Sequence, residues 1–322
     1  MDTFCHAMKR RDFIKTSLAA GAAVTFASLA RAAAQRGEKP IPRRSYKDGI
    51  ELSVIGFGGI VLVGHSQPEA NDMVAEMVDR GINYYDVAPS YGDGQAEERL
   101  GPALGPHRTK VFLACKTTKR DAPGAQEELD RSLQRLQTDH FDLYQFHGVS
   151  KREEVDAIFS KGGAAETFIK ARDQGKVRYL GFSAHSEDAA LAMLDRMAFD
   201  SILFPINFIC YARGNFGPRV VQRAKEKGVA RLALKTLAYT PWPKDAKRTY
   251  PKCWYRPIED RALALQALRF TLSEDITAAI PPGDARLFRM AVDLAAEFTP
   301  LSARERTDLL ASTRDLQPLF KA

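Results

Sequence analysis

Short apolar runs, each followed by a turn and then by a stretch with helical periodicity, recur along this chain from residue 50 onward. Eight such runs are present, at residues 54–57, 82–87, 111–116, 141–147, 177–182, 201–206, 230–236 and 276–280. Amphipathic stretches between them predict helices, among them residues 70–80, 126–136, 153–174, 189–197, 218–227 and 261–272. Strands that alternate with helices in this way pair in parallel and are covered by the helices, so the chain is predicted to be an α/β protein.

Two α/β architectures fit this alternation, and the glycine pattern favours one of them. Eight strand–helix units in roughly 250 residues match a closed (β/α)8, or TIM, barrel. An open doubly wound sheet would require a glycine-rich dinucleotide turn after the first strand. The segment Gly56-Phe57-Gly58-Gly59 lacks a third glycine in the right place and is not followed by a helix-opening pattern. The sequence therefore predicts the barrel.

Additional elements are predicted on both sides of the barrel. Residues 43–46 and 51–53, joined by the turn Lys47-Asp48-Gly49, predict a β-hairpin that plugs the N-terminal mouth of the barrel. Residues 301–312 predict one further helix packed outside, with Thr299 or Ser302 as its cap. The expected organisation is an N-terminal segment over residues 1–34, a barrel over residues 41–298, and a C-terminal helix and tail over residues 299–322.

The N-terminal segment has the features of an export signal. Lys9-Arg10-Arg11-Asp12-Phe13-Ile14-Lys15 precedes an uncharged stretch rich in Ala and Gly at residues 16–30. This stretch is too short and too weakly apolar to span a membrane, which takes about 20 strongly apolar residues. Small residues at Ala30, Ala32 and Ala34 give two cleavage patterns. The alternative interpretation is a basic amphipathic helix.

The segment resembles a bacterial twin-arginine signal, with Ile14 in the position of the usual Leu. This resemblance implies recognition of residues 9–32 by the twin-arginine machinery, which carries folded proteins, and cleavage near Ala32 or Ala34. The mature protein is then expected in the periplasm, without a stable membrane span.

Charge and cysteine spacing narrow the possible partners. Of the formal net charge of +7, residues 1–34 carry +3, which leaves +4 for a body without a basic run. That distribution argues against nucleic acid as a partner. Cys115, Cys210 and Cys253, which remain after removal of Cys5 with the signal, have no metal-ligand spacing. We expect them to be buried thiols, and we expect no metal site.

Three of the predicted strands end in polar side chains, in a fold whose chemistry lies where strands end. Asp86 lies near the end of the second run, Lys116 ends the third, and His147 ends the fourth. Neighbouring strands lie about 4.8 Å apart, so these side chains can meet, and Tyr91 follows Asp86 in a loop that can fold back over them. The alternative is that Asp86 and Lys116 form only a structural ion pair.

These four residues together suit proton transfer to an oxyanion. A tyrosine hydroxyl has a pKa of about 10, and a nearby ammonium is expected to lower it. Asp86 would hold Lys116 charged and oriented, and His147 would orient a carbonyl oxygen. Such a set can protonate an oxyanion as hydride reaches the carbonyl carbon, with the hydride supplied by a cofactor.

The motifs in which these residues lie resemble those of the aldo-keto reductase superfamily. The matching segments are residues 86–92 (Asp-Val-Ala-Pro-Ser-Tyr-Gly), 97–101, Lys116 and 142–147 (Asp-Leu-Tyr-Gln-Phe-His), and the resemblance covers nearly the whole body. It implies that Tyr91 is the general acid, that Lys116 tunes it, that Asp86 supports Lys116, and that His147 orients substrate. It also implies a small carbonyl or alcohol substrate and NADP(H) as cofactor, with NAD(H) as the alternative.

The same resemblance implies a set of cofactor contacts. Ser183 matches a residue that holds the carboxamide in the family, although Ala184 replaces the usual Asn, and Pro282 replaces a frequent Lys at the 2′-phosphate. Arg286 or Arg289 can compensate there, because Arg binds phosphate well. The full set of expected contacts is Gly59, Ser183, His185, Asn207, Lys235, Leu237, Pro281, Gly283, Arg286 and Arg289.

Three further interpretations concern the long loop at residues 238–258 and the alternative functions of the barrel. Residues 238–258, rich in Pro and aromatic residues, are expected to lie over the substrate mouth or else to fold on their own aromatic rings. A non-catalytic NADP-binding or redox-sensor protein on the same barrel is the alternative function. A metal-dependent hydrolase is more distant, for want of a His-x-His motif or a carboxylate cluster.

Overall fold

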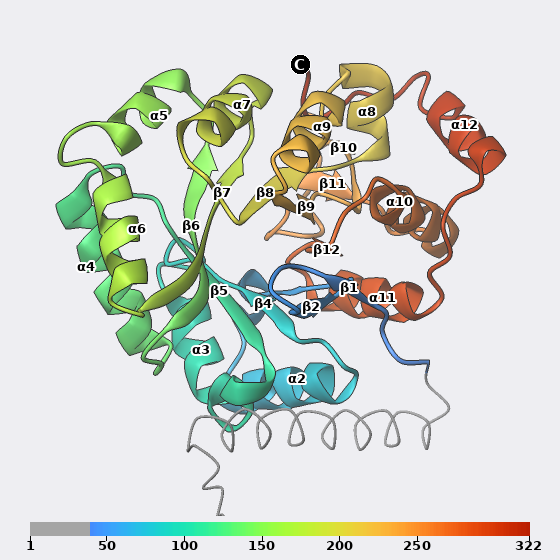
Figure 1. The fold of residues 1–322 in the computed structure, drawn as a ribbon. Coiled ribbons are helices and arrows are strands. Elements are labelled where there is room, and N and C mark those ends of the chain that lie inside the picture. Colours follow the sequence, from blue (N-terminus) through green and yellow to red (C-terminus); the bar gives the residue numbers. More distant parts are fainter. Residues whose placement is uncertain (1–38) are drawn as a thin grey trace, which may run out of the picture.

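The computed structural model describes residues 39–322, so the predicted export signal lies outside the described residues. Eight parallel strands follow one another around a single sheet (Figure 1). They are β3 (Phe57–Gly58), β4 (Tyr84–Asp86), β5 (Phe112–Thr117), β6 (Phe141–Val149), β7 (Val177–Ala184), β8 (Ser201–Pro205), β9 (Ala230–Leu234) and β12 (Ala278–Ala279). The ring closes where Gly56 N donates to Ala279 O at 2.9 Å and Ala279 N donates to Val54 O at 2.8 Å. The predicted barrel is therefore confirmed.

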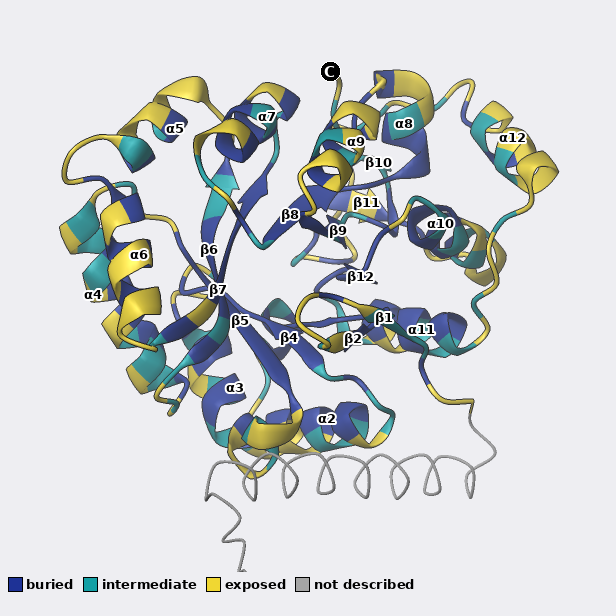
Figure 2. Ribbon diagram, in the orientation of Figure 1, coloured by how far each residue is buried: buried dark blue, intermediate teal, exposed yellow. Residues whose placement is uncertain are grey.

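Helices lie around the strands, with their buried faces turned inward and their exposed faces outward (Figure 2). They are α2 (Gln67–Asp79), α3 (Gln95–Leu104), α4 (Ala122–Arg135), α5 (Arg152–Phe159), α6 (Ala164–Asp173), α7 (Glu187–Arg196), α8 (Phe208–Gly214), α9 (Pro218–Glu226), α10 (Arg261–Ser273), α11 (Ala285–Ala296) and α12 (Ala303–Ala311). Short side chains open several of them: Ser66, Asp121 and Asp260 each accept a backbone N–H of the first turn. Within residues 39–322, no helix has the length and apolarity to cross a membrane.

One helix predicted from periodicity is two helices in the structure. The single helix expected over residues 153–174 is divided into α5 and α6 by residues 160–163. Gly162 adopts a left-handed φ of 76° there, which glycine reaches without a steric cost. A Cβ on the next residue, Gly163, would lie 2.3 Å from the carbonyl oxygen of Ile158. The apolar spacing continues across a break that two glycines impose, which is why periodicity alone missed it.

The hairpin predicted ahead of the barrel is confirmed. Strands β1 (Arg43–Ser45) and β2 (Glu51–Ser53) pair antiparallel and cross in front of the barrel strands in Figure 1. Tyr46 of the hairpin makes edge contacts with Phe112 and Tyr179, at centroid distances of 5.0 and 5.4 Å. The hairpin thus plugs one mouth of the barrel with aromatic side chains, and chemistry is left to the other mouth.

The expected outer helix is also present, as α12. Of the two caps considered for it, Ser302 is the one used: its hydroxyl accepts from Glu305 N at 3.2 Å. The serine amide in turn donates to the Glu305 carboxylate at 2.8 Å, so the two residues form a capping box.

A second hairpin, which the sequence did not predict, lies at the open mouth. Strands β10 (Ala238–Pro241) and β11 (Tyr255–Pro257) pair antiparallel, and the loop between them reaches across to the short 3-10 helix η1 (Gly59–Leu62). Lys252 Nζ donates to Val61 O at 2.7 Å. Since η1 follows β3 and the hairpin follows β9, and β12 lies between these two strands in the closed sheet, this contact joins segments on one side of the mouth that are far apart in the sequence. We call residues 238–258 the mouth loop.

Candidate active site

The barrel interior changes from apolar to polar along the strands. Tyr84, Phe112, Leu143 and Tyr179 form one apolar cluster with the plugging hairpin. Side chains of a strand alternate between its two faces, so the inward residues recur every second position. The inward positions nearer the open mouth hold Asp86, Lys116, Gln145, His147 and Ser183. The strand pattern therefore places a polar layer on an apolar floor, at the end where barrels carry their chemistry.

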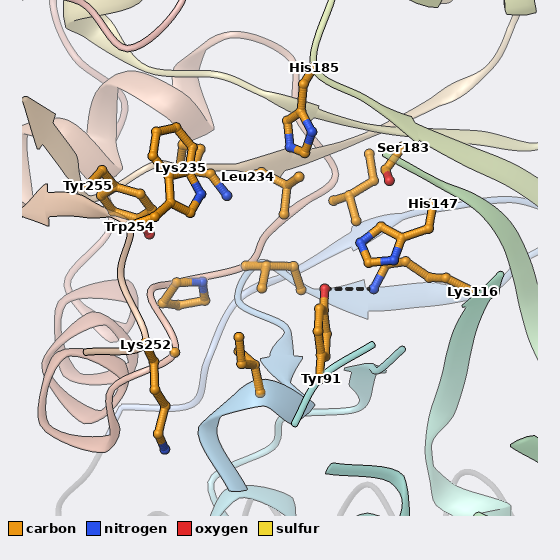
Figure 3. Close-up of a pocket in the computed structure, with 15 residues that line it drawn as sticks. Tyr91, Lys116, His147, Ser183, His185, Leu234, Lys235, Lys252, Trp254 and Tyr255 are labelled. Atoms are coloured by element: carbon orange, nitrogen blue, oxygen red, sulfur yellow. Dashed lines mark hydrogen bonds between the residues drawn. The ribbon is translucent and has the colours of Figure 1, made fainter. Parts of the chain in front are cut away.

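Lys116 is the centre of this layer. It is 1% exposed, and its ammonium forms an ion pair with Asp86, which is equally buried. Lys116 Nζ also donates to Val87 O at 3.2 Å and to Tyr91 Oη at 3.1 Å (Figure 3). An ammonium has three N–H donors, so all three are used. Because the phenol oxygen accepts from the lysine, the phenolic proton remains available to the cavity.

Asp86 is held by two further side chains. Its Oδ2 accepts from Gln145 Nε2 at 2.9 Å and from Tyr84 Oη at 3.4 Å. A buried carboxylate is stable only when it is paired and hydrogen-bonded, and these donors provide that environment. Gln145 was not among the predicted site residues. Its signal was available, since it lies two residues before His147 and so faces the same interior.

Opposing influences set the pKa values of the central pair. Burial would lower the pKa of Lys116, but the charge of Asp86 and the oxygen of Tyr91 outweigh it and hold that pKa above its usual value. For Tyr91, burial raises the pKa above 10, and the neighbouring ammonium offsets only part of this increase. Lys116 does lower the pKa of the phenol, but burial raises it by more. The expected net decrease in the pKa of Tyr91 is therefore wrong. Tyr91 is accordingly a protonated acid at neutral pH.

His147 lies beside the phenol ring and is neutral. The two rings meet edge to face, with centroids 5.7 Å apart. Burial, together with the positive charge of Lys116, lowers the pKa of His147 well below 6.5. Its Nδ1 lies 3.4 Å from Ser90 Oγ, and its backbone carbonyl accepts from Arg120 at 2.8 Å. The imidazole therefore contacts the phenol ring and the Ser90 hydroxyl and is uncharged, which suits a hydrogen-bond partner for a carbonyl oxygen.

These side chains open onto one cavity of about 220 Å³. Tyr91, Lys116 and His147 lie on one side, while Trp254, Tyr255 and Lys252 of the mouth loop lie on the opposite side (Figure 3). The remaining lining residues are Ile60, Ser183, His185, Leu203, Leu234, Lys235, Ile280, Pro281 and Gly283. The mouth loop thus forms part of the cavity wall, as one of the two interpretations of residues 238–258 expected. Lys252 was not predicted, and nothing in its local sequence marks it.

Five of the ten residues expected to contact a cofactor line this cavity. Ser183 Oγ accepts from Gly148 N at 2.8 Å, so its hydroxyl proton is left for another partner. His185 Nε2 is buried and has no hydrogen-bond partner in the described part of the chain. Burial, with a contribution from Lys235, lowers the pKa of His185 to about 4. Pro281 and Gly283 lie at the far wall, and Lys235 completes the group.

Lys235 has an unusual backbone and an unusual environment. Its φ is 64°, a left-handed conformation that residues with a Cβ rarely adopt. Its carbonyl accepts from Asn207 Nδ2 at 3.1 Å and from Ala238 N at 2.9 Å. Its ammonium lies over the rings of Trp254 and Tyr255, at 5.7 and 5.3 Å, and no ion pair of it is found among residues 39–322. Burial lowers its pKa to about 8.

The other five expected cofactor residues lie away from the cavity lining. Asn207 is buried at the start of α8, where Oδ1 accepts from Ile209 N and Cys210 N at 3.0 and 3.1 Å. The Nδ2 group of the same side chain donates to Lys235 O and so fixes the backbone of Lys235. Leu237 is fully buried in the apolar core. Gly59 is also buried, where a Cβ would lie 2.8 Å from Val87 Cγ2.

The two expected phosphate-binding arginines are already paired. Arg286 donates to Asp284 Oδ1 and Oδ2, at 3.1 and 3.2 Å, and its guanidinium lies over Tyr250. Arg289 pairs with Glu76 of α2 at 2.9 Å. The sequence could not reveal the partner of Arg289, because Glu76 is more than 200 residues away along the chain, whereas Asp284 lies only two residues before Arg286.

The sequence also led to expectations about the cysteines and about metal binding. Cys115, Cys210 and Cys253 are buried free thiols, as expected. Among residues 39–322, no cluster of three or more His, Cys, Asp or Glu side chains could hold a metal ion.

Comparison with known proteins gives the family of this barrel. Residues 54–255 match the model of the aldo/keto reductase family, and residues 7–27 match the twin-arginine translocation pathway signal sequence. The chain therefore belongs to the aldo/keto reductase family and is an oxidoreductase that carries a twin-arginine signal sequence.

Individual relatives agree with this assignment. An uncharacterized oxidoreductase of Bacillus subtilis, YqkF, is 23% identical over 303 residues, 85% of this chain and 96% of its own. The holo form of aldo-keto reductase AKR11C1 from Bacillus halodurans superposes with a TM-score of 0.66 at 24% identity, covering 85% of this chain and 96% of its own. An aldo/keto reductase from Klebsiella pneumoniae, solved with NADP and acetate, superposes with a TM-score of 0.63 at 20% identity, covering 86% and 96%.

Proposed function

We propose that this protein reduces the carbonyl group of a small aldehyde or ketone, with Tyr91 as the general acid and NADP(H) as the cofactor. The observation that carries the proposal is the use of the three Lys116 donors. Two of them fix the ammonium to Asp86 and Val87 O, and the third points it at the phenol oxygen of Tyr91 inside the cavity. An isolated structural ion pair would not need the phenol.

In the proposed reaction Tyr91 transfers a proton to the substrate oxygen. The cofactor, when bound, supplies the hydride to the carbonyl carbon. As negative charge develops on the substrate oxygen, Tyr91 Oη–H protonates it, and the phenolate that remains is stabilised by Lys116. Water then restores the proton to Tyr91. Neutral His147 donates a hydrogen bond to the carbonyl through Nε2, since its Nδ1 faces Ser90 Oγ. This tautomer is inferred from the contact.

The raised pKa of Tyr91 favours the reductive direction. An acid with a pKa above 10 is fully protonated at neutral pH and can donate at every turnover. Oxidation of an alcohol would require the phenolate, which is scarce below that pKa. We therefore propose carbonyl reduction as the main activity, with alcohol oxidation rising only in alkaline solution.

The polar groups left without partners fit a nicotinamide dinucleotide. Ser183 and His185 both have hydrogen-bonding capacity directed at the cavity, which suits the carboxamide of a nicotinamide ring. Lys235 supplies an uncompensated positive charge for the phosphates. Its left-handed backbone costs about 1–2 kcal/mol for a residue with a Cβ. We propose that this lysine, whose backbone is held by Asn207, attracts the phosphates of the cofactor into the cavity.

The choice of NADP(H) over NAD(H) depends on whether Arg286 can leave Asp284. Arg286 is 71% exposed, so its ion pair with Asp284 is worth little and can be exchanged for a 2′-phosphate. Because the carboxylate of Asp284 remains nearby, the preference for NADPH over NADH should be small. NAD(H) is accordingly the alternative cofactor. The NADP in the Klebsiella relative supports the first choice.

The signal sequence supports an export proposal. We propose that the folded protein passes through the twin-arginine machinery, is cleaved near Ala32 or Ala34, and acts in the periplasm. A fusion of residues 1–40 to a reporter, compared with the same fusion carrying Arg10→Lys and Arg11→Lys, should be exported only with the two arginines. Export of both fusions to the same extent would refute this route.

The reductase proposal is tested by turnover. Protein purified from the exported fraction is mixed with NADPH and a panel of small aldehydes and ketones, and cofactor absorbance is followed. We expect oxidation of NADPH that depends on the carbonyl compound. Tight NADPH binding without turnover of any panel member would instead support the non-catalytic, redox-sensing alternative.

A further inference from the structure

Phe320 contacts two walls of the cavity without lining the cavity itself. Its ring stacks on the imidazole of His185, with centroids 5.8 Å apart and planes 2° from parallel. On another edge it meets the indole of Trp254 at 5.9 Å and 85°, and it stacks on Phe216 at 5.1 Å. His185 follows β7 and Trp254 belongs to the mouth loop, so one ring links two segments that are separate in sequence.

The segment that carries Phe320 is held against α8. Ala322 N donates to Gly214 O at 2.9 Å, and the backbone of Leu319 and Phe320 lies close enough to the Cys210 thiol to oppose the increase in its pKa that burial causes. The approach is so close that a Cβ on Gly214 would lie 2.2 Å from the carbonyl oxygen of Phe320. Glycine is therefore required at residue 214 for this docking. These contacts fix the ring at a defined place over the cavity wall.

Both walls need such a support. Among residues 39–322, no group hydrogen-bonds to the buried His185 Nε2, so no polar contact at that nitrogen fixes the orientation of the ring. Trp254 is 49% exposed, and its rotamer depends on the rings packed against it, Phe320 and Tyr255. We infer that Phe320 is a positioning residue of the active site, which holds His185 and Trp254 at the cavity so that they can contact the bound ligand.

The kinetic test of this inference rests on the proposed function. A second test, the titration of His185, does not depend on activity. His185 is neutral because it is enclosed, with Lys235 and His147 as its charged or titratable neighbours. Loss of the stacked ring would admit water to the imidazole. Its pKa should then rise from about 4 toward 6.5, which NMR of the histidine ring protons measures directly.

The first test is Phe320→Ala. We expect the KM for the carbonyl substrate to rise roughly tenfold, with kcat nearly unchanged. A misplacement of about 1 Å near the reacting atoms can cost about a hundredfold, and a change in a supporting ring should cost less. The NMR titration of His185 should shift upward in the same variant. Phe320→Tyr, which retains the ring, should restore both values. If the protein turned over no carbonyl compound, the proposed function would fail while the NMR titration still decided this inference.

A second variant tests the same inference away from the cavity. Gly214→Ala should displace the docked segment, whereas Gly105→Ala, with no atom within 4 Å of the new Cβ, is the matched control. Alanine normally stabilises a helical position relative to glycine, so a functional defect in Gly214→Ala would come from the displaced segment. We expect it to reproduce the KM increase and the His185 shift, and Gly105→Ala to show neither. Wild-type KM and wild-type His185 titration in both Phe320→Ala and Gly214→Ala would overturn the inference.

Discussion

Replacing Lys116 by methionine separates the structural role of the buried ion pair from its chemical role. Lys116 and Asp86 are each 1% exposed. Lys116→Met leaves the carboxylate of Asp86 with only Gln145 and Tyr84 as partners. Removing one member of a buried ion pair costs about 3–5 kcal/mol, because the remaining charge is buried without compensation. The free energy of unfolding should fall by that amount in denaturant titrations.

The double variant Asp86→Asn/Lys116→Met removes both charges and keeps the shapes of the side chains. Uncharged residues of similar volume often replace a buried ion pair with little loss. The stability of the double variant should therefore recover to within about 1–2 kcal/mol of the wild type. Asp86→Asn alone should be about as unstable as Lys116→Met, since it leaves a buried ammonium. The four proteins form a double-mutant cycle, which isolates the interaction energy of the pair.

Activity should not follow stability through this cycle. Both variants without Lys116 lose the positive charge at the phenol oxygen of Tyr91, so kcat for carbonyl reduction should fall by about 10²–10³ in each. A double variant that regained wild-type activity along with its stability would show that Tyr91 does not depend on Lys116. A double variant as unstable as the single variants would show that burial of unpaired charge is not what destabilises them.

Three further predictions concern pH and the cofactor. Because the pKa of His147 lies well below 6.5, that of Tyr91 lies above 10 and that of Lys235 lies at about 8, the rate of reduction should be flat between about pH 5.5 and 7; a titration near 6.5 in the pH profile would contradict this. Lys235→Gly should raise the free energy of unfolding by about 1 kcal/mol, because glycine adopts the left-handed backbone without strain, and Lys235→Met should give no such increase. Both variants should weaken NADPH binding by about 10- to 100-fold in fluorescence titrations. Unchanged NADPH affinity in both would exclude Lys235 from the phosphate site. Asp284→Asn should raise the ratio of NADPH to NADH efficiency by up to about fivefold, and Arg286→Ala should lower it; equal ratios in all three proteins would place the 2′-phosphate elsewhere.

The alternation of strands and helices made the barrel predictable, because each strand is a short apolar run between polar turns. The same alternation located the central site residues. Asp86, Lys116 and His147 lie at strand ends, and polar residues there are conspicuous after apolar ones. Period-two alternation would also have given Gln145, which shares the inward face with His147.

Features that depend on tertiary contacts could not be predicted from the sequence. The pairing of Arg289 with Glu76 joins residues 213 positions apart, and no local pattern encodes it. The hydrogen bond from Lys252 to Val61 O, between residues 191 positions apart, is of the same kind. The net shift of the Tyr91 pKa depends on how burial and the ammonium balance, which requires the geometry.

The most direct test of the mechanism is Tyr91→Phe, which removes one oxygen and keeps the ring that packs against His147. NADPH affinity, measured by fluorescence titration, should stay within about twofold of the wild type, while the rate of carbonyl reduction should fall by about 10²–10⁴. A Tyr91→Phe protein that reduced carbonyl compounds at the wild-type rate would show that the phenol of Tyr91 is not the proton donor.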